Sequence, residues 1–212
     1  MKTKFLSSFR CPLPAPGLLL GCALLLGASA SAQNLLKNGD FESPLDPWDP
    51  TGLTGGKTNW TLVYWPGSGG PGDFAMHDRS NNASRHGPTG HGANLRPRTE
   101  NWCHAYFTQT VSGLTSGASY VVSGYVNSVW GDANAGLHIY IEALGGLGSV
   151  VTPDIISNSW NYVYSVTNTA SSSGTIEVRL HENKQHMVND GPGTEKYFGM
   201  DAFFDDFTMT AQ

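Results

Sequence analysis

The chain has 212 residues, including 26 glycines and 12 prolines, and a formal net charge of −5 at pH 7. A chain of this length can bury a sizeable core. Its excess of 17 acidic over 12 basic residues argues against nucleic acid or an anionic membrane as a partner, because either would be repelled over most of the surface.

Residues 1–32 have the pattern of a secretory signal peptide. Three basic residues precede an apolar run over residues 18–26, and Ala30-Ser31-Ala32 supplies a small-residue cleavage site. The run is shorter than the roughly 20 apolar residues of a membrane span, so we expect a secreted protein, extracellular or periplasmic. A lipoprotein would use Cys22, but apolar leucines would then follow the lipidated cysteine, and a removable signal is favoured.

Residues 33–212 are expected to form one domain. Removal of the signal leaves 180 of the 212 residues and a single cysteine, Cys103, so no internal disulfide can form. The signal carries three basic residues and no acidic one, so nine basic residues face 17 acidic ones, a formal charge of −8. Because an exported domain without a disulfide lacks that covalent crosslink, a bound metal is a candidate stabiliser.

Period-2 alternation recurs along the domain, whereas a helical period does not. The expected strands are Tyr106–Val111, Ser119–Val126, Leu137–Ile141, Tyr162–Val166, Thr175–Leu180 and Phe203–Met209. Strands at this spacing without intervening helices predict an all-β fold, an antiparallel sandwich or barrel. The long stretch from Pro66 to about Gly92 contains three histidines, whose spacing matches no short metal-binding motif, and we expect a solvated loop.

The alternation also predicts which side chains point outward. In 137–142 the apolar residues share one face and His138, Tyr140 and Glu142 the other, and the same count turns Arg179, His181 and Tyr125 outward. If these faces belong to one sheet, they form a polar and aromatic floor suited to the hydroxyl groups and C–H faces of a sugar. The alternative is the wet face of a half-buried sheet.

Several segments carry a family resemblance. In chain order they are Asn38–Glu42, Trp60, Gln109–Leu114 with Gly117, Tyr120 and Ser123, Trp160 and Phe204–Asp206. Together they resemble the carbohydrate-binding modules of families 4, 9, 16 and 22, and Arg98-Thr-Glu-Asn-Trp102 looks most similar to family 22. The resemblance implies a galactose-binding-like jelly-roll β-sandwich that binds a polysaccharide or oligosaccharide. Such modules are often appended to enzymes, so a glycan-degrading enzyme is an expected partner.

The resemblance also implies roles for single residues. Trp102 and Arg85 match ligand-binding positions of family 22, and Tyr140 or Glu142 falls near a binding tyrosine. His181 stands where that family presents a glutamate, which puts xylan specificity in doubt. Trp130 is either a ligand platform or a lid over the core edge. Trp60 and Trp160 match tryptophans that pack in the core.

A structural calcium ion is the cofactor that the resemblance implies. Its expected ligands are Glu42 and Asp205, with Asp206 in reserve, because hard cations prefer carboxylate oxygens. The alternative is that these acids sit on edge strands and discourage aggregation.

Two other functional classes stay open. A polysaccharide lyase abstracts a proton with His or Tyr beside an Arg, and the outward residues could supply that set. A two-carboxylate glycosidase is weaker, since Glu142 is the only acid on the predicted face. The third class is a structural or adhesive surface protein. Acidic glycans would be favoured if Arg85, Arg96, Arg98 and Arg179 converged, although the net charge opposes them.

Overall fold

The computed structural model describes residues 33–42, 59–65, 77–78, 85–86, 90–95, 103–129, 137–155, 159–184 and 201–212. These ranges form ten β-strands and contain no α-helix. Among them, accordingly, there is no helix with the length and apolar character needed to cross a membrane. The expected signal peptide and the positions Arg96, Arg98, Trp102 and Trp130 lie outside the described residues.

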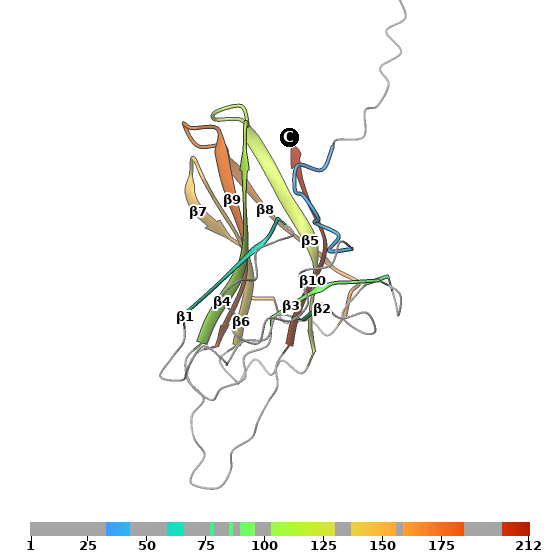
Figure 1. The fold of residues 1–212 in the computed structure, drawn as a ribbon. Coiled ribbons are helices and arrows are strands. Elements are labelled where there is room, and N and C mark those ends of the chain that lie inside the picture. Colours follow the sequence, from blue (N-terminus) through green and yellow to red (C-terminus); the bar gives the residue numbers. More distant parts are fainter. Residues whose placement is uncertain are drawn as a thin grey trace, which may run out of the picture. The chain divides into compact units, whose positions relative to one another are not determined.

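The strands form two antiparallel five-stranded sheets with the core between them (Figure 1). Sheet I has the order β1 (Thr61–Trp65), β4 (Cys103–Ser112), β9 (Thr175–Lys184), β6 (Leu137–Gly145) and β7 (Gly148–Val151). Sheet II has the order β2 (His77–Asp78), β3 (Ala93–Leu95), β10 (Asp201–Ala211), β5 (Ser119–Val129) and β8 (Val163–Thr169). The predicted antiparallel jelly-roll β-sandwich is confirmed.

All six strands expected from period-2 alternation are present. β4, β5, β6, β9 and β10 contain the expected ranges, and β8 begins one residue later than expected. The alternation does not predict β1, β2, β3 and β7, which have two to five residues each. Runs this short give too few repeats for a period to be recognised.

Alternate residues of both sheets fill the core. Phe107, Ile141 and Leu180 of sheet I and Phe204 of sheet II are fully buried, and the rings of Phe107 and Phe204 meet edge to face at 6.4 Å. Burial of each such side chain stabilises the fold by about 1.5–3 kcal/mol.

The two tryptophans expected in the core differ. Trp60 is buried, as expected, and its Nε1 donates a hydrogen bond of 3.1 Å to the carbonyl oxygen of Asn38. Trp160 is only half-buried, so the expectation was wrong for this residue. It lies in the turn before β8 rather than at an inward-facing position of a strand.

The opening segment 34–41 consists of turns and docks along β10. Asn34 donates from Nδ2 to the carbonyl oxygen of Phe207 and accepts at Oδ1 from the amide of Met209, over 3.0 and 2.9 Å. The amide of Phe207 donates to the carbonyl oxygen of Gly39 over 2.6 Å. The two terminal segments therefore pack together, although the first of them is not a strand.

A β-bulge interrupts the pairing of β10 with β5. Asp206 and Phe207 together oppose the single residue Gly124. Asp206 has a φ of 52°, in the left-handed region, and the extra residue lets Phe207 point into the core. A Cβ on Gly124 would lie 2.5 Å from the Phe207 ring, so this position has room only for glycine.

Candidate functional site

The outer face of sheet I carries a compact group of polar and aromatic side chains. Because inward and outward positions alternate along β4, β9 and β6, the register places Tyr106, His181 and Tyr140 in one row across the three strands. The next row contains Thr108, Arg179 and Glu142. We define the outer-face cluster as His104, Tyr106, Thr108, Tyr140, Glu142, Glu177, Arg179 and His181.

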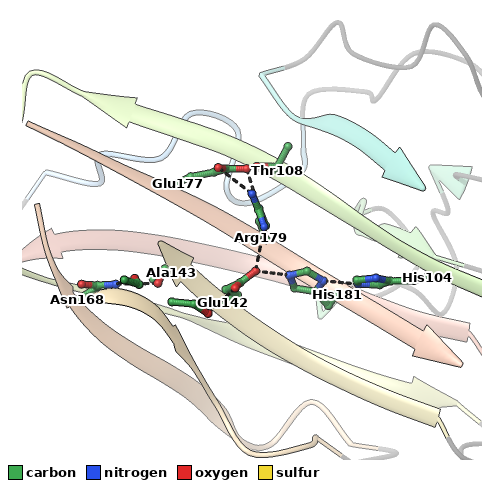
Figure 2. A network of polar contacts seen from close by, with 10 residues as sticks. His104, Thr108, Glu142, Ala143, Asn168, Glu177, Arg179 and His181 are labelled. Atoms are coloured by element: carbon green, nitrogen blue, oxygen red, sulfur yellow. Dashed lines mark hydrogen bonds and ion pairs between the residues drawn. The ribbon is translucent and has the colours of Figure 1, made fainter. Parts of the chain in front are cut away.

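Arg179 joins the two carboxylates of the cluster (Figure 2). Its Nε and Nη2 donate to Oε1 and Oε2 of Glu177 over 2.7 and 3.1 Å, and its Nη1 donates to Oε2 of Glu142 over 3.4 Å. Thr108 donates to Glu177 over 2.8 Å, and Ser149 donates to Oε1 of Glu142. This forked pairing fixes the guanidinium in one orientation.

Two histidines extend the network away from Glu142 (Figure 2). Nε2 of His181 lies 2.8 Å from Oε2 of Glu142, and Nδ1 of His181 lies 2.8 Å from Nε2 of His104. A carboxylate can only accept, so His181 donates from Nε2, and as a neutral ring it accepts at Nδ1 from His104. The network thereby sets the tautomer of both rings.

Burial and pairing set the charge of these groups. Burial lowers the pKa of His181 to about 4, although the hydrogen bond to Glu142 acts in the opposite direction. Burial also lowers the pKa of His104. Burial alone would raise the pKa of Glu142, but hydrogen bonds from Ser149 and His181 outweigh it and hold that pKa below its usual value. Around neutral pH both imidazoles are therefore neutral and the carboxylate is charged.

Stacked rings fill the centre of the cluster. The rings of Tyr140 and His181 lie 4.4 Å apart at 14°, and the ring of Tyr106 lies 4.7 Å from that of His181. The guanidinium carbon of Arg179 lies 5.0 Å from the Tyr106 ring centroid. His181 is 2% exposed and Tyr106 6%, whereas Tyr140 is half-buried. Tyr140 is therefore the aromatic side chain that this row offers to a ligand.

His138 borders the cluster on β6. The register places it in a row with Asn183 and His104. Its Nδ1 contacts Oδ2 of Asp154, and its side chain is 34% exposed. A partly exposed imidazole fixed by a carboxylate can exchange hydrogen bonds with a polar ligand at the end of the cluster.

Tyr125 does not join this face, because the outward faces that would have formed one surface belong to two sheets, and Arg85 lies beside Tyr125 rather than in the cluster. Tyr125 lies on β5 of sheet II, where it pairs with Asp205 and Val163. The guanidinium carbon of Arg85 lies 3.8 Å from the Tyr125 ring centroid. The reason is the topology: β5 follows β4 and precedes β6 in the sequence, but β4 and β6 belong to sheet I and β5 belongs to sheet II.

Four cluster residues escape the sequence prediction, namely His104, Tyr106, Thr108 and Glu177. Tyr106 and Thr108 lie in an expected strand and have the outward parity of that strand, which is a usable signal. His104 precedes the expected range, and the observed strand begins at Cys103. Glu177 lies on the outward face of an expected strand, but its role depends on its contacts with Arg179 and Thr108 on neighbouring positions.

The predicted calcium ligands separate into two groups. The carboxylate of Glu42 contacts the backbone and side-chain nitrogens of His91, over 3.2 and 3.3 Å. Asp205 is fully buried, and ligand atoms of Asp205, Asp206 and His86 all lie within 4.8 Å of one another. This second group could hold a cation through oxygen and nitrogen ligands.

Arg85 and His86 already engage the acids of that second group. Nη1 of Arg85 donates to Oδ2 of Asp206 over 2.8 Å, and Nε2 of His86 lies 2.9 Å from Oδ1 of the same carboxylate. The hydrogen bond to Asp206 raises the pKa of His86. The amide of Arg85 donates to Oδ2 of Asp205 over 2.8 Å.

No protein-family model and no curated protein matches the chain. Similar solved structures include TmCBM61 in complex with β-1,4-galactotriose, at 18% identity and a TM-score of 0.46, covering 85% of this chain and 100% of that one. The CBM22-1 xylan-binding domain of Paenibacillus barcinonensis Xyn10C is similar at 15% identity and a TM-score of 0.47, covering 85% and 95%.

A phage structure is also similar. The enzymatically active domain of tailspike protein 4 of bacteriophage CBA120 has 15% identity and a TM-score of 0.52 over 84% of this chain, which spans 21% of the tailspike chain. At this level of identity the likeness concerns the β-sandwich fold.

Proposed function

We propose that this protein binds a neutral polysaccharide or oligosaccharide on the outer face of sheet I, without converting it chemically. The observation that carries the proposal is the outer-face cluster, in which Tyr140 lies beside a fixed set of donors and acceptors. Sugars need an apolar ring surface for their C–H faces and oriented polar groups for their hydroxyls. Groups held by one another lose little freedom when a ligand binds.

The charge of the cluster favours a neutral glycan over an acidic one. Glu142 and Glu177 supply two carboxylates against the single guanidinium of Arg179, and the lowered pKa values of His104 and His181 leave both imidazoles uncharged. A uronate would meet net negative charge. The arginine cluster that would favour acidic glycans loses support, since Arg85 lies over Tyr125 of sheet II, whereas Arg179 lies on β9 of sheet I.

Binding is favoured over lyase or glycosidase chemistry because His181 and Arg179 of the outer-face cluster are poorly accessible to a substrate. A catalytic base must come within hydrogen-bond reach of the substrate. His181 is 2% exposed and lies against the Tyr140 ring, and the guanidinium of Arg179 is bonded to two carboxylates. These contacts suit a rigid recognition surface.

Truncation of Tyr140 tests the binding site. Tyr140→Ala removes the accessible ring, and we expect its affinity for the bound glycan to fall at least about tenfold, equivalent to about 1.4 kcal/mol. Isothermal titration against neutral xylan, glucan and galactan oligosaccharides and a polyuronate measures the change. Leu147→Ala, which removes a 66% exposed side chain from the turn between β6 and β7, is the control and should bind like the parent protein.

Three outcomes would overturn this proposal. Failure to retain any glycan would favour a structural or adhesive role. Preference for the polyuronate would contradict the charge argument. Release of reducing or unsaturated ends that disappears in His138→Ala or His181→Ala would show an enzyme.

In this proposal the signal-peptide pattern of residues 1–32 directs export of the protein. Residues 1–32 would be removed on secretion, and the intact mass of the exported protein measures that step. A glycan-degrading enzyme is the partner that the resemblance suggests, and co-purification from the culture medium tests it. A measured mass that still includes residues 1–32 would contradict the export proposal.

We also propose that a calcium ion stabilises the sandwich near Asp205 and Asp206. Both carboxylates supply the oxygens that calcium prefers, and Asp205 is buried. Glu42 fits this site less well because its carboxylate contacts His91, and the nitrogen of His86 suits a transition metal better than calcium.

Chelation tests the cation. Treatment with EDTA should lower the melting temperature by several degrees, because an ion bound only by the folded state stabilises it, and added calcium should restore it. Asp205→Asn should make the melting temperature insensitive to calcium. A melting curve unchanged by EDTA would rule out the ion, and restoration by zinc alone would replace calcium with a transition metal.

A further inference from the structure

A cavity of about 490 Å³ opens on sheet II, the sheet that does not carry the outer-face cluster. Its volume falls within the roughly 300–1,000 Å³ typical of small-ligand sites. The polar lining includes Asn38, Asp40, Arg85, Ser123, Tyr125 and Asp206. In Figure 1 the opening segment, in blue, runs beside β10 and β5, whose residues line the cavity.

The β-bulge of β10 builds one side of this cavity. Phe207 turns into the core at the bulge, whereas the carboxylate of Asp206 stays 21% exposed at the cavity. Beside it, the hydroxyls of Ser123 and Thr208 form a hydrogen bond of 3.0 Å and both line the cavity. Bulges often redirect a side chain in this way next to a functional site.

Arg85 and Asp206 supply a paired donor and acceptor. The ion pair of 2.8 Å and the ring of Tyr125, 3.8 Å beneath the guanidinium, hold Arg85 in place. Asp40 lines the cavity with a second carboxylate, whose Oδ1 is 3.4 Å from the amide of Glu42. Neighbouring sugar hydroxyls each donate and accept, so adjacent carboxylate and guanidinium groups can bind them together.

One exposed apolar side chain lines the cavity. Val163 is 55% exposed and is one of the four large apolar side chains that are exposed among the described residues. An apolar side chain beside polar groups can contact the C–H face of a sugar residue that those groups bind.

We propose that this cavity is a second saccharide-binding site, with one sugar residue held by Arg85, Asp40 and Asp206 and in contact with Val163. Arg85 and Tyr125 thus act in glycan recognition on sheet II. Two sites on opposite sheets would let one molecule bridge two glycan chains.

Nuclear magnetic resonance titration tests the second site. The probes are xylotetraose, cellotetraose and β-1,4-galactotetraose, each up to millimolar concentration. One of them should shift the backbone amides of Ser123, Tyr125 and Thr208 as well as those of Tyr140 and His181, with separate saturation curves. Asp40→Ala and Arg85→Gln should each weaken the binding reported by the first group at least fivefold and leave the binding reported by the second group unchanged.

Matched variants separate this inference from the proposed function. Tyr140→Ala should abolish only the sheet I shifts, and Leu147→Ala should change neither group. Shifts confined to sheet I would overturn the second site and leave the proposed function standing. Shifts confined to the cavity would support the second site and overturn the proposed one, and no shift in either group would overturn both. Cavity shifts that persist in both Asp40→Ala and Arg85→Gln would also overturn the inference.

Discussion

Replacing Glu142 by alanine is expected to lower the free energy of unfolding by about 3 kcal/mol, because the buried His181 and the partly buried Arg179 lose their shared acceptor. The carboxylate accepts hydrogen bonds from Ser149, His181 and Arg179. The side chain of Arg179 keeps 24% exposure, so water compensates part of the loss. At about 2–4 °C per kcal/mol for a domain of this size, the melting temperature should fall by about 6–12 °C in calorimetry.

Glu177→Ala is the matched control for this variant. Glu177 pairs with the same guanidinium, but its side chain is 30% exposed and Arg179 keeps Glu142 as a partner. The expected loss is therefore about 1 kcal/mol or less. Equal losses in the two variants would contradict the central place of Glu142 in the network.

Replacing Gly39 by alanine is expected to cost about 2–3 kcal/mol, through overpacking against β10. A Cβ at this position would lie 2.0 Å from the carbonyl oxygen of Phe207. The obstacle is backbone, so no rotamer change relieves it, and the opening segment must move away from Phe207 and break the Asn34 hydrogen bonds. The melting temperature should fall by about 4–12 °C.

Lys37→Ala is the control in the same segment. The side chain is exposed, and the backbone of residue 37 keeps both hydrogen bonds to the Gln109 side chain, of 2.8 and 2.9 Å. We expect a change within about 0.5 kcal/mol. A Gly39→Ala variant that melts with the parent protein would show that the segment does not depend on this close approach.

The strands were predictable because each is defined by local alternation. In β6 and β9 the inward positions are apolar over several repeats, for example Ile139 and Ile141, so the outward parity of His138, Tyr140, Arg179 and His181 followed as well. Glu182 shows the limit of the argument. Its parity matches that of Leu180, and it is a charged residue that is 1% exposed.

The membership of the site was less predictable. The alternation along β5 correctly predicts that Tyr125 points outward, but β5 belongs to sheet II. Alternation within one strand does not indicate which sheet that strand joins. The partners of Arg179 show the same limit, since Glu177, Glu142 and Tyr106 become its neighbours only through the pairing of β9 with β4 and β6.

The sequence by itself determined the six long strands and the inward or outward direction of most of their residues. These properties depend on local periodicity, which a single run of residues is enough to show. Only the tertiary structure decided that the predicted ligand face divides between two sheets, with Tyr140 on one and Tyr125 on the other. That division depends on long-range strand pairing, whose register brings together side chains far apart in the sequence.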